Sequence, residues 1–245
     1  DLVSFNERRN GCSPLNPVCC DAPASPWCEQ DSGDSHNRSR AWASEAEKRQ
    51  MMRNFFTAMM IAHGTPMLLG GDEWMRTQLG NNNAYSTGAD NSYNHFRWGT
   101  WLADPIRQRM HDFVRQMIAF RKANQHAFAP KTYGGGAPFA WKRPENTDAV
   151  DWAGKALMIH YWDADAGPEL AILINMDREA HPFTLPGART WRRAVDTQAW
   201  WDSDDFLADQ DPSISHNVTR ETGEVMPVTY DVTGSSIVIM QADAP

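Results

Sequence analysis

The sequence predicts an α/β plus all-β chain: the C-terminal end of a TIM-type (β/α)8 barrel over residues 1–130, then an antiparallel β-sandwich over residues 131–245. Helical periodicity and one short apolar segment in the first part indicate a helix-then-strand step of a barrel. Short apolar runs separated by Gly, Pro, Asp and Asn in the second part indicate a sandwich. A closed barrel takes about 250 residues, so we expect a missing N-terminal barrel portion of the same protein.

The first helix is expected to begin at a capping box that runs from Ser44 to Glu47. Apolar residues then recur at helical spacing, which favours a core-facing stripe over a cofactor pocket, and Gly64 is expected to end the helix. The apolar segment Met67–Leu69 predicts a strand buried on both faces. Such a strand needs neighbours on each side, so the sequence predicts either a missing partner or an exposed apolar face.

A second amphipathic helix is expected over residues 105–124. Asp104 is suited to the N-cap position, and Pro105 is suited to the first helical position that follows it. A long polar loop over residues 74–103 precedes this helix, and loops of such length in compact domains are usually functional or disordered. Its aromatic residues, which include Trp98 and Trp101, favour an ordered loop.

After residue 130 the sequence pattern changes from helical periodicity to short apolar runs, which indicates strands. The six predicted runs are Ala156–Trp162, Leu170–Asn175, Phe183–Leu185, Trp191–Val195, Val225–Asp231 and Ser236–Gln241.

Composition excludes several classes of function. The 23 Lys and Arg against 31 Asp and Glu leave a net charge of −8, which argues against nucleic acid, because binding there needs clustered basic side chains. No apolar run approaches the length of a membrane-spanning helix, so we expect no membrane partner. Eleven Trp residues are a large number for 245 residues, and their flat apolar faces with a polar edge favour carbohydrate binding as one hypothesis.

Four cysteines lie within the first 28 residues, in a loop rich in Pro, Ser and Asn. This crowding predicts one or two disulfides and an oxidising, extracytoplasmic compartment, with free thiols in a cytosolic protein as the alternative. Zinc is disfavoured, because its sites need paired short spacings. The disulfide candidates are Cys12, Cys19, Cys20 and Cys28.

The segment GTPMLLGGDEW at residues 64–74, continued by RTQ at 76–78 and GNNNAY at 80–85, resembles the isoamylase and glycogen-debranching branch of the α-amylase family, glycoside hydrolase family 13. It is similar to the last barrel strand of that branch and the loop after it. The opening DLVSFN resembles the segment after the seventh strand, and IAFRKANQ at 118–125 resembles the following helix. Beyond residue 130 the chain is similar to the family's sandwich domain only in pattern.

The resemblance implies a complete protein that hydrolyses α-1,6-glucosidic branch points in glycogen or starch with retention of configuration. Retaining enzymes use two carboxyl groups about 5–5.5 Å apart. In the family these groups and a third carboxylate lie on earlier strands, so we expect all three upstream of Asp1 and assign no catalytic residue here. The 245-residue chain alone is expected to be inactive. The chemistry requires no cofactor or metal. The acidic segment Trp201–Asp211 is either a calcium site or a solvated acidic loop, and the sequence leaves both open.

Substrate-binding or site-supporting residues are expected in the loop after the apolar segment. Asp72 and Glu73 are expected mainly to support the site, with Arg76 keeping both ionised. Amide groups can bond sugar hydroxyls, and aromatic rings can stack on sugars, although packing is the simpler role for Trp74 and for His63. The remaining candidates are Asn81, Asn82, Asn83, Tyr85, Trp98 and Trp101.

Three hypotheses for function follow. The first is a debranching hydrolase whose partner is an α-glucan polysaccharide. The second is a related α-1,4-acting or transglycosylating enzyme on the same scaffold. The third is a non-catalytic carbohydrate-binding or accessory module. The resemblance to glycogen-debranching enzymes favours the cytoplasm, whereas the cysteines favour an extracytoplasmic location, so the compartment stays open.

Overall fold

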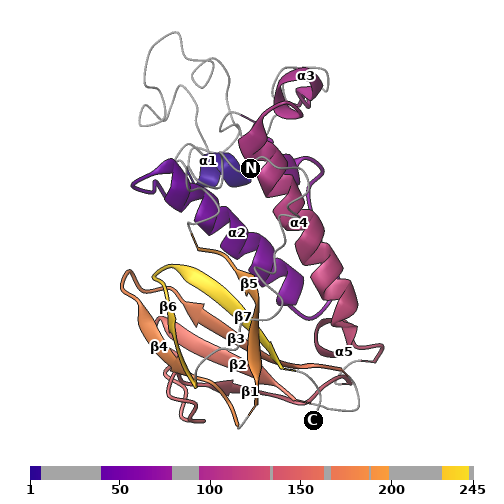
Figure 1. Cartoon of the computed structure of the whole chain (residues 1–245). Coiled ribbons are helices and arrows are strands. Elements are labelled where there is room, and N and C mark those ends of the chain that lie inside the picture. The colour runs from indigo at the N-terminus through magenta and orange to yellow at the C-terminus, as the bar shows by residue number, and fades with distance from the viewer. Residues whose placement is uncertain are drawn as a thin grey trace. The chain divides into compact units, whose positions relative to one another are not determined.

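The computed structural model describes residues 1–6, 40–78, 94–132, 135–162, 167–187, 189–198 and 228–242 (Figure 1). The chain divides into two compact units. The first unit comprises residues 1–52 and 67–112, and the second comprises residues 53–66 and 113–245. The predicted domain boundary near residue 130 stays a prediction. No helix in the described parts of the chain is long and apolar enough to cross a membrane.

Helix α2, Glu45–Ile61, begins where the capping box predicts. The backbone N–H of Glu47 donates to Ser44 Oγ at 3.1 Å, and the Glu47 carboxylate accepts from the backbone N–H of Ala43 at 2.9 Å. These two bonds satisfy amide groups that a helix N-terminus leaves without partners. The helix ends before Gly64, which has a φ of 99°.

Helix α4, Pro105–Ala123, confirms the second predicted helix. Asp104 Oδ1 accepts from the backbone N–H of Ile106 at 2.9 Å, as an N-cap side chain should. Four short helices accompany the two long ones: α1, Leu2–Phe5; the 3-10 helix η3, Asp72–Trp74; α3, Trp98–Trp101; and α5, Gln125–Phe128.

The predicted strand at Met67–Leu69 is wrong for this chain. Residues 65–69 have no regular secondary structure, and the side chains of Met67 and Leu69 are 89% and 53% exposed. A parallel strand needs backbone partners on both sides, and the described residues provide none for this segment. The apolar side chains of this segment are therefore exposed, as expected for a segment without its neighbouring strands.

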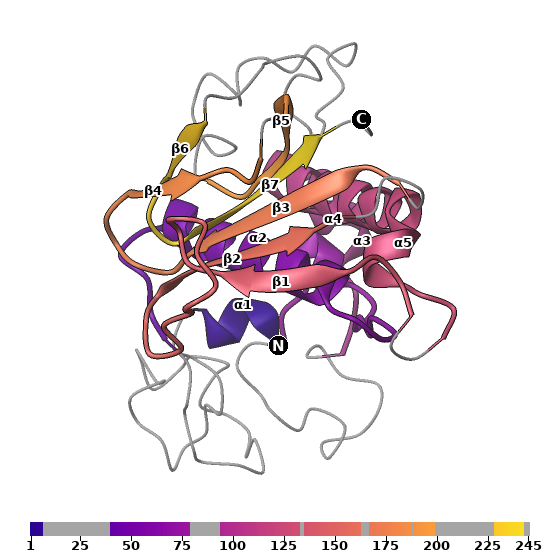
Figure 2. The same ribbon diagram turned by 90° about the horizontal axis from the view of Figure 1, so that it is seen from below.

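The second unit contains two antiparallel sheets. The larger has the strand order β1-β2-β3-β7-β5, which Figure 2 shows, and the smaller pairs β4 with β6. The strands are β1, Phe139–Lys142; β2, Ala156–Tyr161; β3, Glu169–Asn175; β4, His181–Thr184; β5, Trp191–Asp196; β6, Thr229–Val232; and β7, Ser236–Ala242.

Each of the six predicted runs overlaps one strand, which confirms the antiparallel, sheet-rich second part. Strand β1 was missed, because four residues at a sheet edge with alternating exposed and half-buried side chains give a weak signal. The finer assignment, a barrel end joined to a sandwich, stays a prediction.

The two sheets share one hydrophobic core. Met158 and Leu173 of the larger sheet, Phe183 of β4 and Val232 of β6 belong to the same buried cluster. The opposite face of the larger sheet carries Tyr161, whose ring meets that of Phe128 edge-on at 5.6 Å. Both faces of the larger sheet therefore contribute apolar side chains to the packing of this unit.

The part of α2 that belongs to the second unit is tied to the sheet by polar contacts. Arg53 Nη2 donates to the carbonyl of Gln198 at 3.1 Å, and Asn54 Nδ2 donates to the carbonyl of Ser235 at 2.7 Å. Thr197 Oγ1 donates to Asn54 Oδ1 and accepts from the backbone N–H of Ile237 at 2.8 Å. These bonds join α2 to the residues that follow β5 and to those at the start of β7.

Candidate functional site

The described part of the predicted site is a tight loop in the first unit. It contains η3 between two residues in the left-handed region, Gly71 at φ 102° and Met75 at φ 54°. The carbonyl of Gly71 accepts from the backbone N–H groups of both Trp74 and Arg76 at 2.9 Å. A Cβ at position 71 would lie 2.7 Å from Arg76 Cδ, so the loop requires glycine there.

Glu73 holds the loop in shape. Its Oε2 accepts from the backbone N–H of Gly71 at 2.8 Å. The carboxylate therefore anchors the backbone of its own loop, which is consistent with a supporting role.

Asp72 and Arg76 place buried polar atoms in the same loop. Arg76 is only 9% exposed, and within the described part of the chain neither its Nη1 nor Asp72 Oδ1 has a hydrogen-bond partner. Burial raises the pKa of Asp72, although the positive charges of the Asp1 ammonium group and of Arg76 lower it. The expectation that Arg76 keeps Asp72 and Glu73 ionised stays a prediction.

The opening segment of the chain lies beside residues 71–78, which we call the motif loop. Asp1 Oδ2 accepts from the backbone N–H of Gln78 at 2.8 Å and from Thr77 Oγ1 at 3.4 Å. Asn6 Oδ1 accepts from Trp42 Nε1 at 2.8 Å. The structure therefore brings the opening segment, residues 1–6, against residues 77 and 78 of the motif.

A cluster of aromatic side chains packs around Trp74 of the loop. Trp74 stacks on His111 with ring centroids 4.3 Å apart. The Phe96 ring meets that of Trp101 edge-on at 5.0 Å and lies tilted against that of Trp98 at 4.5 Å. Trp101 is buried, whereas Trp98 is 69% exposed. Packing is therefore the role of Trp74 and Trp101, and Trp98 is the stacking candidate whose face remains accessible in this unit.

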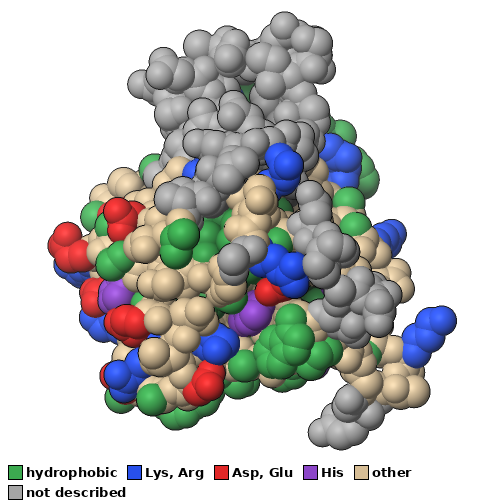
Figure 3. Space-filling view, turned by 60° about the horizontal axis from the view of Figure 1, so that its bottom comes forward, with side chains coloured by type: hydrophobic (Ala, Val, Ile, Leu, Met, Phe, Trp, Pro, Cys, Tyr) green, Lys and Arg blue, Asp and Glu red, His purple; other side chains and the backbone are tan. Residues whose placement is uncertain are grey.

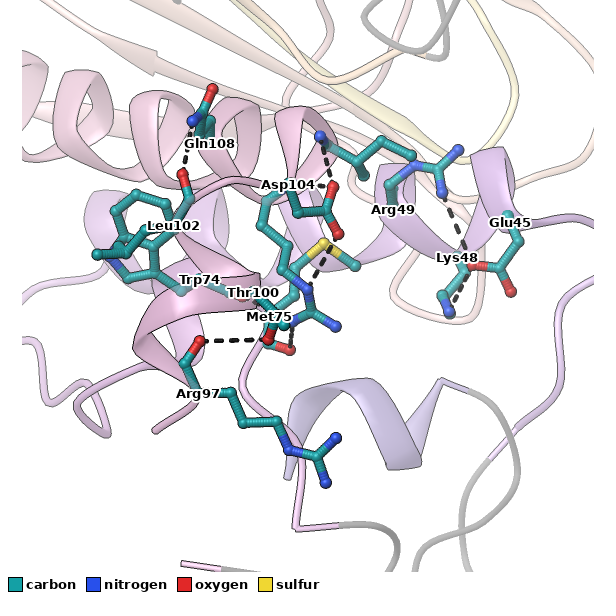
Figure 4. A network of polar contacts seen from close by, with 12 residues as sticks. Glu45, Lys48, Arg49, Trp74, Met75, Arg97, Thr100, Leu102, Asp104 and Gln108 are labelled. Atoms are coloured by element: carbon teal, nitrogen blue, oxygen red, sulfur yellow. Dashed lines mark hydrogen bonds and ion pairs between the residues drawn. The ribbon is translucent and has the colours of Figure 1, made fainter. Parts of the chain in front are cut away.

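Arg107 connects α4 to the motif loop, and sequence reasoning missed it. Its Nη1 donates to the carbonyl of Trp74 at 2.8 Å and to that of Met75. Its Nε lies 3.3 Å from Asp104 Oδ2, and its guanidinium lies over the Trp101 ring. Figure 4 shows Asp104, Trp74 and Met75 in this network. A basic residue in the first turn of α4 was the available signal, since cations are not favoured there without a partner.

The remaining predicted site residues fall outside the described parts of the chain. The candidate calcium segment, Trp201–Asp211, also falls outside them. Among described residues, no group of three or more His, Cys, Asp or Glu side chains could hold a metal ion. The residues outside the description are Asn81, Asn82, Asn83, Tyr85, Cys12, Cys19, Cys20 and Cys28.

Solved structures show the fold. Pullulanase from Bacillus acidopullulyticus superposes with a TM-score of 0.59 over 95% of this chain and 23% of its own, at 14% identity. Pullulanase type I from Bacillus subtilis str. 168, complexed with maltose, superposes with a TM-score of 0.57 over 82% of this chain and 24% of its own, at 16% identity.

Sequence comparison finds no matching family model but finds similar proteins. Isoamylase from Pseudomonas amyloderamosa is 29% identical over 228 residues, which cover 82% of this chain and 28% of the relative. Isoamylase from Flavobacterium sp is 27% identical over 220 residues, 82% of this chain and 26% of the relative. The Glycogen operon protein GlgX homolog of Haemophilus influenzae is 27% identical over 222 residues, 80% of this chain and 29% of the relative.

This chain spans about a quarter of the length of the relatives that it matches. The similarity extends well beyond residue 130, where the sequence alone showed only a pattern. Together with the motif at residues 64–85, these comparisons confirm that the chain resembles the isoamylase and glycogen-debranching branch of the α-amylase family.

Proposed function

We propose that this chain is the C-terminal portion of a glycoside hydrolase that cleaves α-1,6 branch points in glycogen- or starch-type glucan. One observation carries the proposal: isoamylases match four fifths of the chain but only about a quarter of their own length is matched. The pullulanase-like fold is consistent with it.

The proposed mechanism retains configuration. A carboxylate nucleophile and a carboxylic acid/base would lie about 5–5.5 Å apart, and both would belong to residues preceding Asp1 in the complete protein. The third carboxylate would position the sugar. No residue of the 245 is assigned to bond cleavage.

The motif loop would support the bound sugar. Arg76 Nη1 and Asp72 Oδ1 are buried within the loop, so these two residues would act through the shape and charge of the loop and not by direct contact with a sugar hydroxyl. Glu73 and Arg107 would hold the loop backbone. The amide and aromatic candidates at residues 81–85 would add contacts to the same substrate.

The experiment is product analysis with the complete protein and with the 245-residue chain in parallel. We expect the complete protein to release linear chains from amylopectin, while the 245-residue chain releases no reducing ends. Amylose separates linkages, because only an α-1,4-acting enzyme shortens it. Failure of the complete protein to release linear chains would contradict the debranching assignment, and activity on amylose alone would favour the α-1,4 alternative.

A further inference from the structure

Three aromatic rings lie along strand β1 and the β1–β2 connection, at the edge of the larger sheet. Phe139 and Trp141 are two residues apart, so both leave the same sheet face, and their rings meet edge-on at 6.1 Å. Trp152 packs against Trp141 with centroids 5.7 Å apart and planes inclined by 64°. The exposed fractions of Phe139, Trp141 and Trp152 are 40%, 41% and 71%. We call these three residues the aromatic edge.

The inner end of the aromatic edge is fixed by further contacts. Phe139 stacks on Tyr161 at 5.2 Å and meets the His63 ring edge-on at 5.6 Å. The Tyr161 hydroxyl and His63 Nε2 share a hydrogen bond of 3.2 Å. Burial raises the pKa of Tyr161 to about 12, so its hydroxyl keeps its proton. Rings held in this way cost little ordering entropy when a ligand binds.

A cavity of about 960 Å³ opens beside the aromatic edge and shares Phe139 with it. Its lining also includes His63, Thr65, Lys131 and Thr132. These side chains offer imidazole, hydroxyl and ammonium groups to a ligand that extends from Phe139 into the cavity. The site therefore combines flat apolar faces with hydrogen-bonding groups.

Charge at the aromatic edge favours a neutral ligand. The ammonium group of Lys142, next to Trp141, is paired with Asp148 Oδ1 at 2.8 Å, so this part of the hairpin has balanced charge. Figure 3 shows one face of the molecule on which hydrophobic side chains reach the surface among charged ones. A sugar fits such a site, because it is neutral and combines apolar C–H faces with many hydroxyls.

We propose that the aromatic edge is a non-catalytic binding site for an α-glucan chain. The identity of the ligand rests on the proposed function, whereas the site itself rests on the ring geometry. Pyranose rings present C–H groups to the electron-rich faces of aromatic side chains. An α-linked chain curves, so successive sugars can meet the inclined planes of Trp141 and Trp152. The site would hold the polysaccharide independently of bond cleavage.

The test is electrophoresis of the 245-residue chain in native gels that contain glycogen, with glycogen-free gels as reference. We expect glycogen to retard the chain, and Trp152→Ala to raise the apparent Kd about tenfold. Trp152→Phe should retain most of the affinity, and the Trp141→Ala/Trp152→Ala double variant should lose retardation. Trp162→Ala is the matched control, because Trp162 is 41% exposed and contacts His160 instead. Far-UV circular dichroism and thermal melting check that each variant folds.

Absence of retardation of the wild-type chain would overturn the proposal, and so would equal retardation of the wild-type chain and the Trp152→Ala variant. If the edge instead packs against another part of a longer protein, Trp152→Ala would lower the melting temperature of that protein and leave glycogen retardation unchanged, which also overturns the proposal. Debranching by the complete protein is measured separately, so failure of this site and failure of the proposed function are distinguishable.

Discussion

Arg121 shows how much one side chain can organise in this fold. Its guanidinium donates to the carbonyl oxygens of Met60, Ala62 and Gly64, which end α2, and to that of Phe128 in α5. The residue is 8% exposed, and burial lowers its pKa. The planar fork of five N–H donors suits several carbonyls at once, so Arg121 serves as a shared C-terminal cap.

We predict that Arg121→Lys lowers the free energy of unfolding by about 3 kcal/mol, because an ammonium group cannot reach all four carbonyls and buried carbonyls lose partners. Urea unfolding followed by circular dichroism measures the change. Lys122→Arg, at an exposed position of the same helix, should change stability by less than about 0.5 kcal/mol. Equal midpoints for the two variants would contradict the assignment of Arg121 as a cap.

Gly71 is the second residue on which a local structure depends. We predict that Gly71→Ala costs about 1–3 kcal/mol, because its φ is 102° and the new Cβ would meet Arg76 Cδ at 2.7 Å. Gly70→Ala is the matched control, since a Cβ at position 70 meets nothing within 4 Å. Urea unfolding of both variants measures the difference, and an equally small effect of both would argue against the loop geometry.

At the scale of elements, the start of α2 depends on the Ser44 and Glu47 pair. We predict that Ser44→Ala costs about 1 kcal/mol, because the Glu47 backbone N–H loses its acceptor. Ser44→Asp should restore most of that stability, since a carboxylate caps a helix N-terminus equally well. Thermal melts and far-UV circular dichroism measure both variants, and a melt of Ser44→Ala that matches the wild type would refute the cap.

Strands β2 and β3 are linked by a titratable pair. His160 Nε2 lies 2.6 Å from Glu169 Oε1, and Glu169 Oε2 accepts from Arg189 Nε at 2.9 Å. Burial lowers the pKa of His160, and the charges of Lys142 and Arg189 act in the same direction. Glu169 opposes the shift by its hydrogen bond and charge.

Because the unfolded chain binds a proton at His160 more readily than the folded chain, stability from this group is fully present above about pH 6.5 and is lost as the pH falls from there through the lower pKa of the folded chain. We predict that His160→Gln flattens the decline of unfolding free energy between about pH 7 and pH 5. Urea midpoints at several pH values measure it. A parallel decline in wild type and variant would mean that other groups set the pH dependence.

At the scale of the whole molecule, the helices and strands were easier to predict from the sequence than the burial and the contacts of their side chains. The capping box, the Asp104 N-cap and the six strand runs are local patterns, and the structure confirms them. Met67–Leu69 was misjudged because burial of a strand depends on neighbours that a local pattern cannot supply. The effect of burial on the pKa of Asp72 was not foreseen for a similar reason, since desolvation depends on packing. Arg107 and the aromatic edge were missed because contacts between distant residues create them.

Exposure of Met67 gives the chain a built-in chemical reporter. Its thioether lies in a segment open to solvent, whereas Met52, Met117 and Met158 are fully buried. Oxidation of methionine to the sulfoxide follows access of the oxidant, so brief peroxide treatment should label Met67 well before those three. Peptide mass spectrometry after such a pulse would then read out, in any preparation, whether another polypeptide shields the apolar segment of the motif.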